Sequence, residues 1–177
     1  MAQKLRPPVG GNDHVQGDVT APLELVEYGD YQCPHCGRAY PIIKRIQRKM
    51  GQDLKFVFRN FPLSEAHPQA FQAAIATEAA AKQGAFWAMH DIIFENQALL
   101  EELPFIEFAK RLGLDISRFE KDLDDPTLAE KVDSDFSSGV RSGVNGTPGF
   151  FINGIRYDDS WDEQILLARL KKVLTKI

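Results

Sequence analysis

The spacing of apolar and polar positions changes several times along the chain, and each change marks an expected element. LELVEY at 23–28 is short, apolar and rich in β-forming residues, which predicts a strand. From 33 to about 50 the apolar residues recur at helical spacing, so we expect a helix there. LKFVFRNFPL at 54–63 is apolar on both faces, as an interior strand would be. Residues 1–22 are rich in Gly, Pro and Asp and predict an extended lead-in.

From Pro68 to about Ser142 the chain is rich in alanine and helical in its spacing. Four helical segments are expected there: PQAFQAAIATEAAAKQG, AFWAMHDIIFENQALL, LPFIEFAKRLG and PTLAEKVDSDFSSGVRSG. Strands return at GFFING and IRY, where Asn153-Gly154 is typical of a tight hairpin turn. A final amphipathic helix covers about 161–176. The chain thus predicts an α/β protein with the order β-α-β, a helical block, then β-β-α.

The composition narrows the possible classes of protein and of partner. The chain has 177 residues, a net charge of −4 and no basic cluster, so we expect no nucleic-acid partner. No apolar run is long enough to span a bilayer, so we expect no membrane partner either. The N-terminus has a basic start without an apolar run behind it. We therefore expect a cytoplasmic protein or, if an export segment is missing from this sequence, a periplasmic or other extracytoplasmic one.

The only two cysteines lie in YGDYQCPHCGRAYP at 28–41, at the predicted junction of a strand and a helix. A structural zinc site needs four ligands, and beyond Cys33 and Cys36 the chain offers only four scattered histidines. Inert buried thiols are common in proteins, but that reading does not explain a place at the start of a helix. A redox pair requires that place, so the motif favours thiol–disulfide chemistry, with no metal and no organic cofactor.

The predicted helix start gives each residue of the motif a role. Unpaired backbone N–H groups and the positive end of the helix dipole favour a thiolate at Cys33, so we expect Cys33 to attack. Pro34 suits the first helical position, where no N–H is needed. His35 adds a donor or a positive charge beside the sulfur, unless it is simply an exposed polar residue. Cys36, one turn along, is placed to resolve a mixed disulfide.

A second motif, NGTPGFFING at 145–154, precedes the third predicted strand. A proline at this place could simply start an edge strand. Beside a redox pair, a cis bond between Thr147 and Pro148 would instead leave the backbone groups of Thr147 free to pair with an extended substrate. We therefore expect Thr147 and Pro148 to bind substrate.

Together, VEYGDYQCPHC and GVNGTPGFFING resemble the DsbA-like thiol–disulfide oxidoreductases of the thioredoxin superfamily, and the resemblance runs from the first predicted strand to the last helix. It implies a thioredoxin fold with an inserted all-helical domain. Residues 1–66 and 143–177 would form a discontinuous thioredoxin-like domain, and residues 67–142 the inserted domain.

By position, the resemblance implies that Cys33 is the nucleophile, Cys36 the resolving thiol and Thr147-Pro148 a cis-proline loop. Glu27 falls where this family often keeps an acidic residue, at the end of the first strand beneath the active site. A carboxylate there would act as a general base for the proton of Cys36. The alternation of apolar and polar residues does not show which face of this strand is buried. The alternative is therefore that Glu27 lies on a solvated face.

We therefore predict an enzyme that exchanges disulfides with protein thiols, a separate redox partner that recycles it, and a monomer. Two alternatives remain open. A glutathione-dependent transferase or isomerase of small molecules would share the fold, but such relatives generally lack the second cysteine, so Cys36 argues against this function. A peptide-binding module with incidental cysteines would keep its affinity when Cys33 is replaced, whereas an exchanger would lose all turnover.

Overall fold

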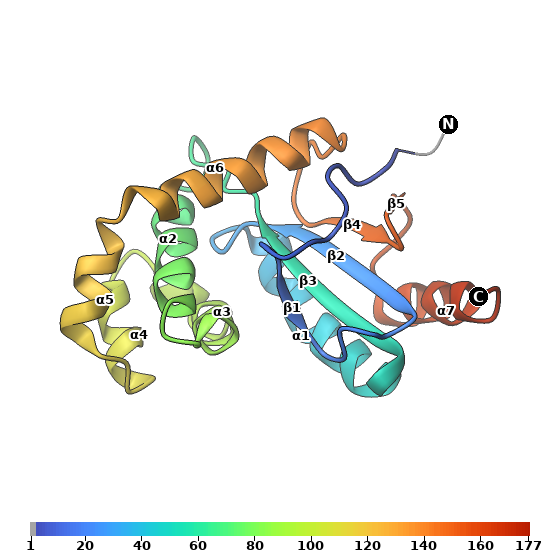
Figure 1. Ribbon diagram of the computed structural model, residues 1–177, viewed down its shortest axis with the longest axis horizontal. Helices are drawn as coiled ribbons and strands as arrows, with labels where there is room; N and C mark the ends of the chain where they lie inside the picture. Colours follow the sequence, from blue (N-terminus) through green and yellow to red (C-terminus); the bar gives the residue numbers. More distant parts are fainter. Residues whose placement is uncertain (1–2) are drawn as a thin grey trace.

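Within residues 3–177, which the computed structural model describes, a five-stranded mixed sheet of order β1-β3-β2-β4-β5 lies at the centre (Figure 1). Residues 1 and 2, part of the predicted lead-in and first domain, lie outside the described residues. β2 and β3 are parallel, whereas β1 pairs antiparallel with β3, β4 with β2, and β5 with β4. The strands are β1 (His14–Gln16), β2 (Leu23–Gly29), β3 (Leu54–Asn60), β4 (Gly149–Ile152) and β5 (Ile155–Tyr157).

Side chains of the central strands explain why the sheet is covered on both faces. Leu23 and Leu25 of β2 enter the core cluster that also holds the apolar residues of α1 (Pro34–Met50) and α7 (Glu163–Leu174). Val26 and Tyr28, which point the other way, enter a second cluster. β3 lies between β1 and β2 and is buried at nearly every position, which confirms the interior strand expected for this part of the chain.

A series of helices lies between β3 and β4. They are α2 (Ala70–Ala81), α3 (Phe86–Glu95), α4 (Phe105–Arg111), α5 (Ile116–Leu123) and α6 (Pro126–Arg141). In Figure 1, α2 to α5 gather to one side of the sheet, and α6 runs from them back across the sheet toward β4. The division into an inserted domain of residues 67–142 and a discontinuous one stays a prediction. None of the helices within residues 3–177 has both the length and the apolar character needed to cross a lipid bilayer.

Two elements differ from the sequence prediction. β1 lies inside the expected extended lead-in and pairs with β3, with Val15 opposite Val57. The extended lead-in thus contains a strand that the sequence analysis does not single out, because three residues are too few to show a strand period and the pairing itself stabilises them. α5 is not among the four predicted helical segments. Asp115 caps it by accepting a hydrogen bond from the backbone N–H of Arg118 at 3.0 Å, which lets a short helix form.

Candidate active site

Cys33 lies at the N-terminus of α1, directly after the loop that leaves β2. Its backbone is extended, with φ −68° and ψ 123°, and its carbonyl oxygen accepts the first helical hydrogen bond from the N–H of Gly37 at 3.0 Å. Pro34 is the first helical residue, where the ring fits because an N–H would have no intrahelical partner. Both cysteines are free thiols; Cys36 is completely enclosed, and Cys33 is 3% exposed.

The surroundings of Cys33 stabilise its thiolate. A hydrogen bond from the Cys36 thiol lowers the pKa of Cys33 to about 5; Thr147 and the backbone N–H groups of Cys36 and His35 act in the same direction, whereas burial opposes the shift. These N–H groups are the free donors of the first turn of α1. At neutral pH Cys33 is therefore mostly thiolate, which is the nucleophilic form.

Cys36 has the opposite environment. Burial raises the pKa of the Cys36 thiol well above its usual range, and the hydrogen bond that it gives to Cys33 acts in the same direction, as does the charge of Glu27 once that carboxyl is ionised. The backbone N–H of Asp30, 3.5 Å from the Cys36 sulfur, acts against them. Cys36 thus keeps its proton at a pH where Cys33 is ionised, so the two sulfurs differ in what they can do.

Glu27 is buried rather than solvated. It pairs across the sheet with Phe58 of β3 and Phe150 of β4, and it is 3% exposed. Burial, together with the charge on Cys33, raises the pKa of Glu27 to about 8, so its carboxyl is mostly protonated at neutral pH. The alternative of a solvated Glu27 is therefore wrong, whereas its role as a general base stays a prediction.

The loop before β4 comes directly against Cys33. The peptide between Thr147 and Pro148 is cis. The Cys33 sulfur lies 3.6 Å from the carbonyl oxygen of Thr147, to which the thiol form donates. The Thr147 hydroxyl is buried and has no hydrogen-bond partner within the described part of the chain. Two motifs 114 positions apart thus meet at one sulfur.

His35 lies at the surface, one residue beyond Pro34. Its Nδ1 accepts a hydrogen bond from the Arg38 guanidinium, one turn further along α1. The group through which His35 lowers the pKa of Cys33 is its backbone N–H. Tuning of the thiolate by the imidazole ring stays a prediction.

Two side chains that the sequence analysis does not single out hold the loop before Cys33. The Asp30 carboxylate accepts hydrogen bonds from the N–H groups of Gln32 at 2.8 Å and Cys33 at 3.1 Å. Gln97, in the turn after α3, donates from Nε2 to the carbonyl oxygens of Tyr31 at 3.0 Å and Cys33 at 2.8 Å. Asp30 carries a local signal, because aspartate often accepts from N–H groups two residues on. Gln97 carries none, since its partners are 66 and 64 positions away.

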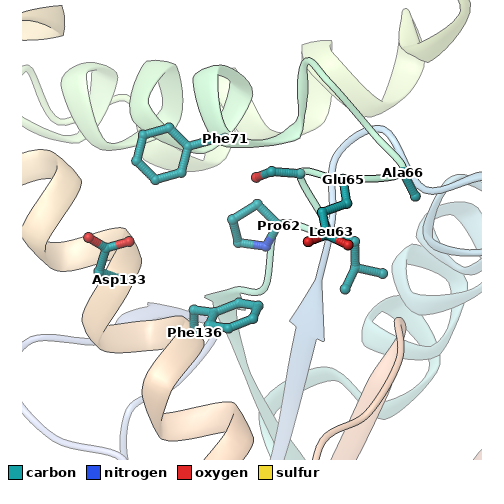
Figure 2. Close-up of a pocket in the computed structure, with 8 residues that line it drawn as sticks. Pro62, Leu63, Glu65, Ala66, Phe71, Asp133 and Phe136 are labelled. Atoms are coloured by element: carbon teal, nitrogen blue, oxygen red, sulfur yellow. The ribbon is translucent and has the colours of Figure 1, made fainter.

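A hollow of about 540 Å³ lies beside the loop that follows β3 (Figure 2). Its lining is mainly apolar: Pro62, Leu63, Ser64, Glu65, Ala66, Phe71, Asp133 and Phe136. Figure 2 shows Phe71 of α2 and Phe136 of α6 on either side of Pro62. Neither cysteine is part of this lining.

The sequence of the chain is similar to a family model and to several curated proteins. The family model described as thioredoxin matches residues 10–172. The chain is 42% identical over 169 residues to the Na(+)/H(+) antiporter NhaA 1 of Mycolicibacterium vanbaalenii, a match that covers 94% of this chain and 27% of that protein. The protein of the same name from Salinispora arenicola is 41% identical over 156 residues, with 88% and 24% covered. The chain therefore spans about a quarter of the length of these curated relatives.

Solved structures match along nearly the whole chain. The fold is similar to that of oxidised BdbD from Bacillus subtilis, with a TM-score of 0.84 at 25% identity, covering 99% of this chain and 98% of that one. It is also similar to DsbA2 of Pseudomonas aeruginosa, with a TM-score of 0.77 at 26% identity and 95% and 97% covered. At this coverage the likeness includes the helices between β3 and β4 as well as the sheet.

Proposed function

The chain belongs to the thioredoxin family, and on this premise we propose that it is a thiol–disulfide oxidoreductase of the DsbA type, which exchanges disulfides with the cysteines of other proteins. The observation that carries the proposal is the pair of opposite pKa shifts: that of Cys33 is lowered to about 5, whereas burial raises that of Cys36. A helix start alone supplies an attacking thiolate. The second thiol beside it is what allows the covalent intermediate to be released.

The reaction follows from these two states. In the reducing direction, the Cys33 thiolate attacks a substrate disulfide, forms a bond to one sulfur and displaces the other as a thiolate, which takes up a proton. Cys36 then loses its proton and attacks Cys33, so that the Cys33–Cys36 bond forms and the mixed disulfide breaks. The second substrate sulfur leaves with the electron pair and is protonated. The substrate gains two electrons that the cysteine pair loses, and the oxidising direction runs the same steps in reverse.

The other candidate residues act around this exchange. Glu27 receives or returns the proton of Cys36; its burial on the face of β2 that α1 covers supports this role. Thr147 and Pro148 hold the substrate chain, because a mixed disulfide at Cys33 must pass the Thr147 carbonyl. Pro34 and His35 complete the helix start, with the N–H of His35 directed to the thiolate.

The partners are proteins with thiols or disulfides, together with a separate redox protein, because each turnover leaves the pair in the opposite oxidation state. One chain carries every group of the exchange, so a monomer is sufficient. The antiporter name of the curated relatives describes proteins of which this chain matches about a quarter. We propose thiol chemistry, and no ion transport, for the part represented here.

The reduction potential of the pair tests the proposal. After equilibration with mixtures of reduced and oxidised glutathione, alkylation of the free thiols measures the oxidised fraction. Because the Cys33 thiolate stabilises the reduced form, we expect a potential above the roughly −270 mV of thioredoxin and toward the roughly −120 mV of DsbA. Cys33→Ser and Cys36→Ser should each abolish the transition. A pair that forms no disulfide at any glutathione ratio would contradict the proposed function.

A further inference from the structure

The Asp30 side chain is completely buried at the end of β2, and both of its carboxylate oxygens are occupied. Oδ1 accepts hydrogen bonds from the backbone N–H groups of Gln32 at 2.8 Å and Cys33 at 3.1 Å. Oδ2 accepts from the N–H of Leu63 at 2.9 Å and from Nδ1 of His67 at 2.8 Å. Asp30 thereby ties the loop that leads to Cys33 to the loop that follows β3.

These contacts determine the direction of the Asp30 backbone. A buried carboxylate loses its hydration, so it is retained where hydrogen-bond donors replace the lost water. With its side chain held by donors 33 and 37 positions away, Asp30 turns its own N–H inward, 3.5 Å from the Cys36 sulfur. Asp30 thus contacts both cysteines. Its carboxylate accepts a hydrogen bond from the backbone N–H of Cys33, and its own backbone N–H points at the sulfur of Cys36.

We infer that Asp30 is a positioning residue for the resolving thiol: its carboxylate holds the loop so that its backbone N–H points at the Cys36 sulfur. The inference rests on the proposed function, because it concerns the step in which Cys36 forms or breaks its disulfide. In the reducing direction Cys36 loses its proton, its electron pair forms the bond to Cys33, and the bond from Cys33 to the substrate breaks. The N–H stabilises the Cys36 thiolate in this step, and equally in reverse, where Cys36 is the leaving group.

The attacking step depends on other groups. The Cys36 thiol and the N–H groups at the start of α1 hold the Cys33 thiolate, whereas the N–H of Cys33 itself is directed to Asp30. Loss of the Asp30 carboxylate should therefore slow resolution by Cys36 far more than attack by Cys33. General damage to the fold would instead slow both steps together.

A stopped-flow reaction of the reduced protein with dithiobis(nitrobenzoate) separates the two steps. Attack by Cys33 releases one coloured thionitrobenzoate and leaves the other bonded to Cys33; resolution by Cys36 releases the second and forms the intramolecular disulfide. We expect Asp30→Ala to slow the second release about tenfold or more, and the first by less than about twofold, because hydrogen bonds to charged groups are the stronger ones. Asp30→Asn keeps one oxygen for Gln32 and Cys33, so it should fall between Asp30→Ala and the wild type.

Asp18→Asn is the matched control. Asp18 Oδ1 accepts hydrogen bonds from the N–H and the hydroxyl of Thr20, at 2.8 and 2.7 Å, in an exposed turn away from the cysteines, so this variant should keep both rates. Unchanged second releases in both Asp30 variants, or equal slowing of both releases, would overturn the inference. If Asp30→Ala does not fold, the ratio of the two rates in Asp30→Asn decides. A wild-type protein that releases only the first thionitrobenzoate would overturn the proposed function, and the inference with it.

Discussion

Two identical side chains, three positions apart at the start of α1, are driven to opposite chemical states by what surrounds them. One hydrogen bond contributes to both shifts: the Cys36 thiol donates to Cys33, which lowers the pKa of Cys33 and raises that of Cys36. The free N–H groups of the first turn reinforce the effect on Cys33, and complete burial reinforces the effect on Cys36. The reactivity of Cys33 therefore depends on the donor at position 36.

Two substitutions of Cys36 separate this donor from the sulfur that carries it. Cys36→Ser keeps an O–H donor, so the pKa of Cys33 should stay near 5. Cys36→Ala removes the donor and should raise that pKa by about one unit or more. The rate of alkylation by iodoacetamide against pH measures it, because each variant has a single thiol and only the thiolate reacts. Equal midpoints in the two variants would contradict the assigned hydrogen bond.

The raised pKa of Glu27 predicts how the rate of resolution by Cys36 depends on pH. Because its pKa is raised to about 8, the carboxyl becomes a base only as the pH rises through that value. If it accepts the proton of Cys36, the second release of thionitrobenzoate should accelerate with an inflection at or just below pH 8, because burial, the larger cause of the raised pKa, remains in the mixed disulfide while the charge of Cys33 is lost. Glu27→Gln should lose the inflection and slow that release about 100-fold at high pH.

The control for this prediction lies on the same strand. Glu24→Gln changes the same charge at a site where Glu24 pairs with Lys55 at 3.2 Å, away from the cysteines. It should keep the wild-type pH profile. An inflection near pH 8 that persists in Glu27→Gln would show that another group takes the proton.

The helix α1 meets the turn after α3 at Gly37. A Cβ at this position would collide with the side-chain amide of Gln97, so the missing side chain is what lets Gln97 reach the carbonyl oxygens of Tyr31 and Cys33. Glycine inside a helix costs about 1 kcal/mol relative to alanine. The contact between the two elements offsets this local disadvantage and holds the loop before the attacking thiol.

A double-mutant cycle tests this contact. Gly37→Ala should lower the free energy of unfolding by about 1–2 kcal/mol, because it displaces an amide that donates two hydrogen bonds. In a Gln97→Ala background the same change should raise it by about 0.5–1 kcal/mol, because only helix propensity then remains. Urea unfolding of the four proteins gives both values. The same loss in both backgrounds would mean that the two residues do not interact.

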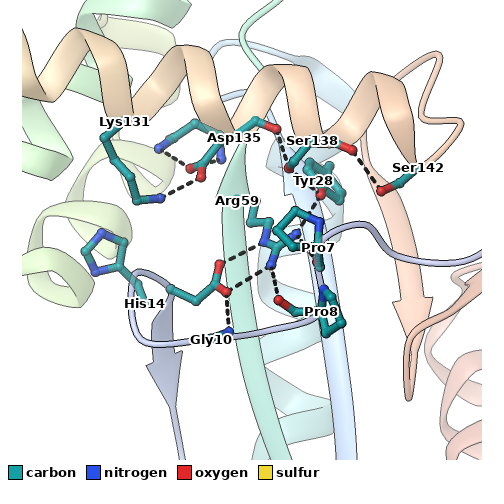
Figure 3. Close-up of polar contacts among 12 residues, drawn as sticks. Pro7, Pro8, Gly10, His14, Tyr28, Arg59, Lys131, Asp135, Ser138 and Ser142 are labelled. Atoms are coloured by element: carbon teal, nitrogen blue, oxygen red, sulfur yellow. Dashed lines mark hydrogen bonds and ion pairs between the residues drawn. The ribbon is translucent and has the colours of Figure 1, made fainter.

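Arg59 links distant parts of the chain on the face of the sheet opposite the cysteines. It is 2% exposed, and its guanidinium donates to both Asp13 oxygens at 2.8 and 2.9 Å, to two carbonyl oxygens of the N-terminal segment and to the Tyr28 hydroxyl (Figure 3). The Tyr28 hydroxyl in turn shares a hydrogen bond of 2.7 Å with Ser138 of α6. One cation therefore joins the N-terminal segment, the two central strands and α6.

Asp13→Asn should separate stability from chemistry. It leaves the buried Arg59 charge without its partner, so we expect the free energy of unfolding to fall by about 3 kcal/mol. Glu107→Gln, which breaks an exposed pair with Lys110, should lower it by less than about 1 kcal/mol. Urea unfolding compares the two variants, and alkylation against pH should give an unchanged pKa of Cys33 in both. A shift of that pKa in Asp13→Asn would show that the two faces of the sheet are coupled.

The features that could be predicted from the amino-acid sequence are local ones. The order of elements follows from the period of apolar residues, and the candidate redox pair from two cysteines at a predicted helix start, whereas the thioredoxin fold is what the resemblance of the two motifs implies. The hairpin at Asn153 and Gly154 is of this kind, since both residues adopt the positive φ that the dipeptide predicts. Each of these signals involves residues a few positions apart, so no knowledge of distant contacts is needed to find it.

Contacts between distant segments, in contrast, become visible only once the chain is folded. The spacing of residues in the sequence does not predict these contacts, because many other partners fit the same local pattern. They include the Thr147 oxygen beside Cys33, the burial of Glu27, the donors to Asp30 and the three-residue strand β1. The pKa of a thiol depends on burial and on the donors around it, and these come from the whole fold. The sequence therefore determined that Cys33 and Cys36 are the candidate pair, and the fold around them shifts their pKa values in opposite directions.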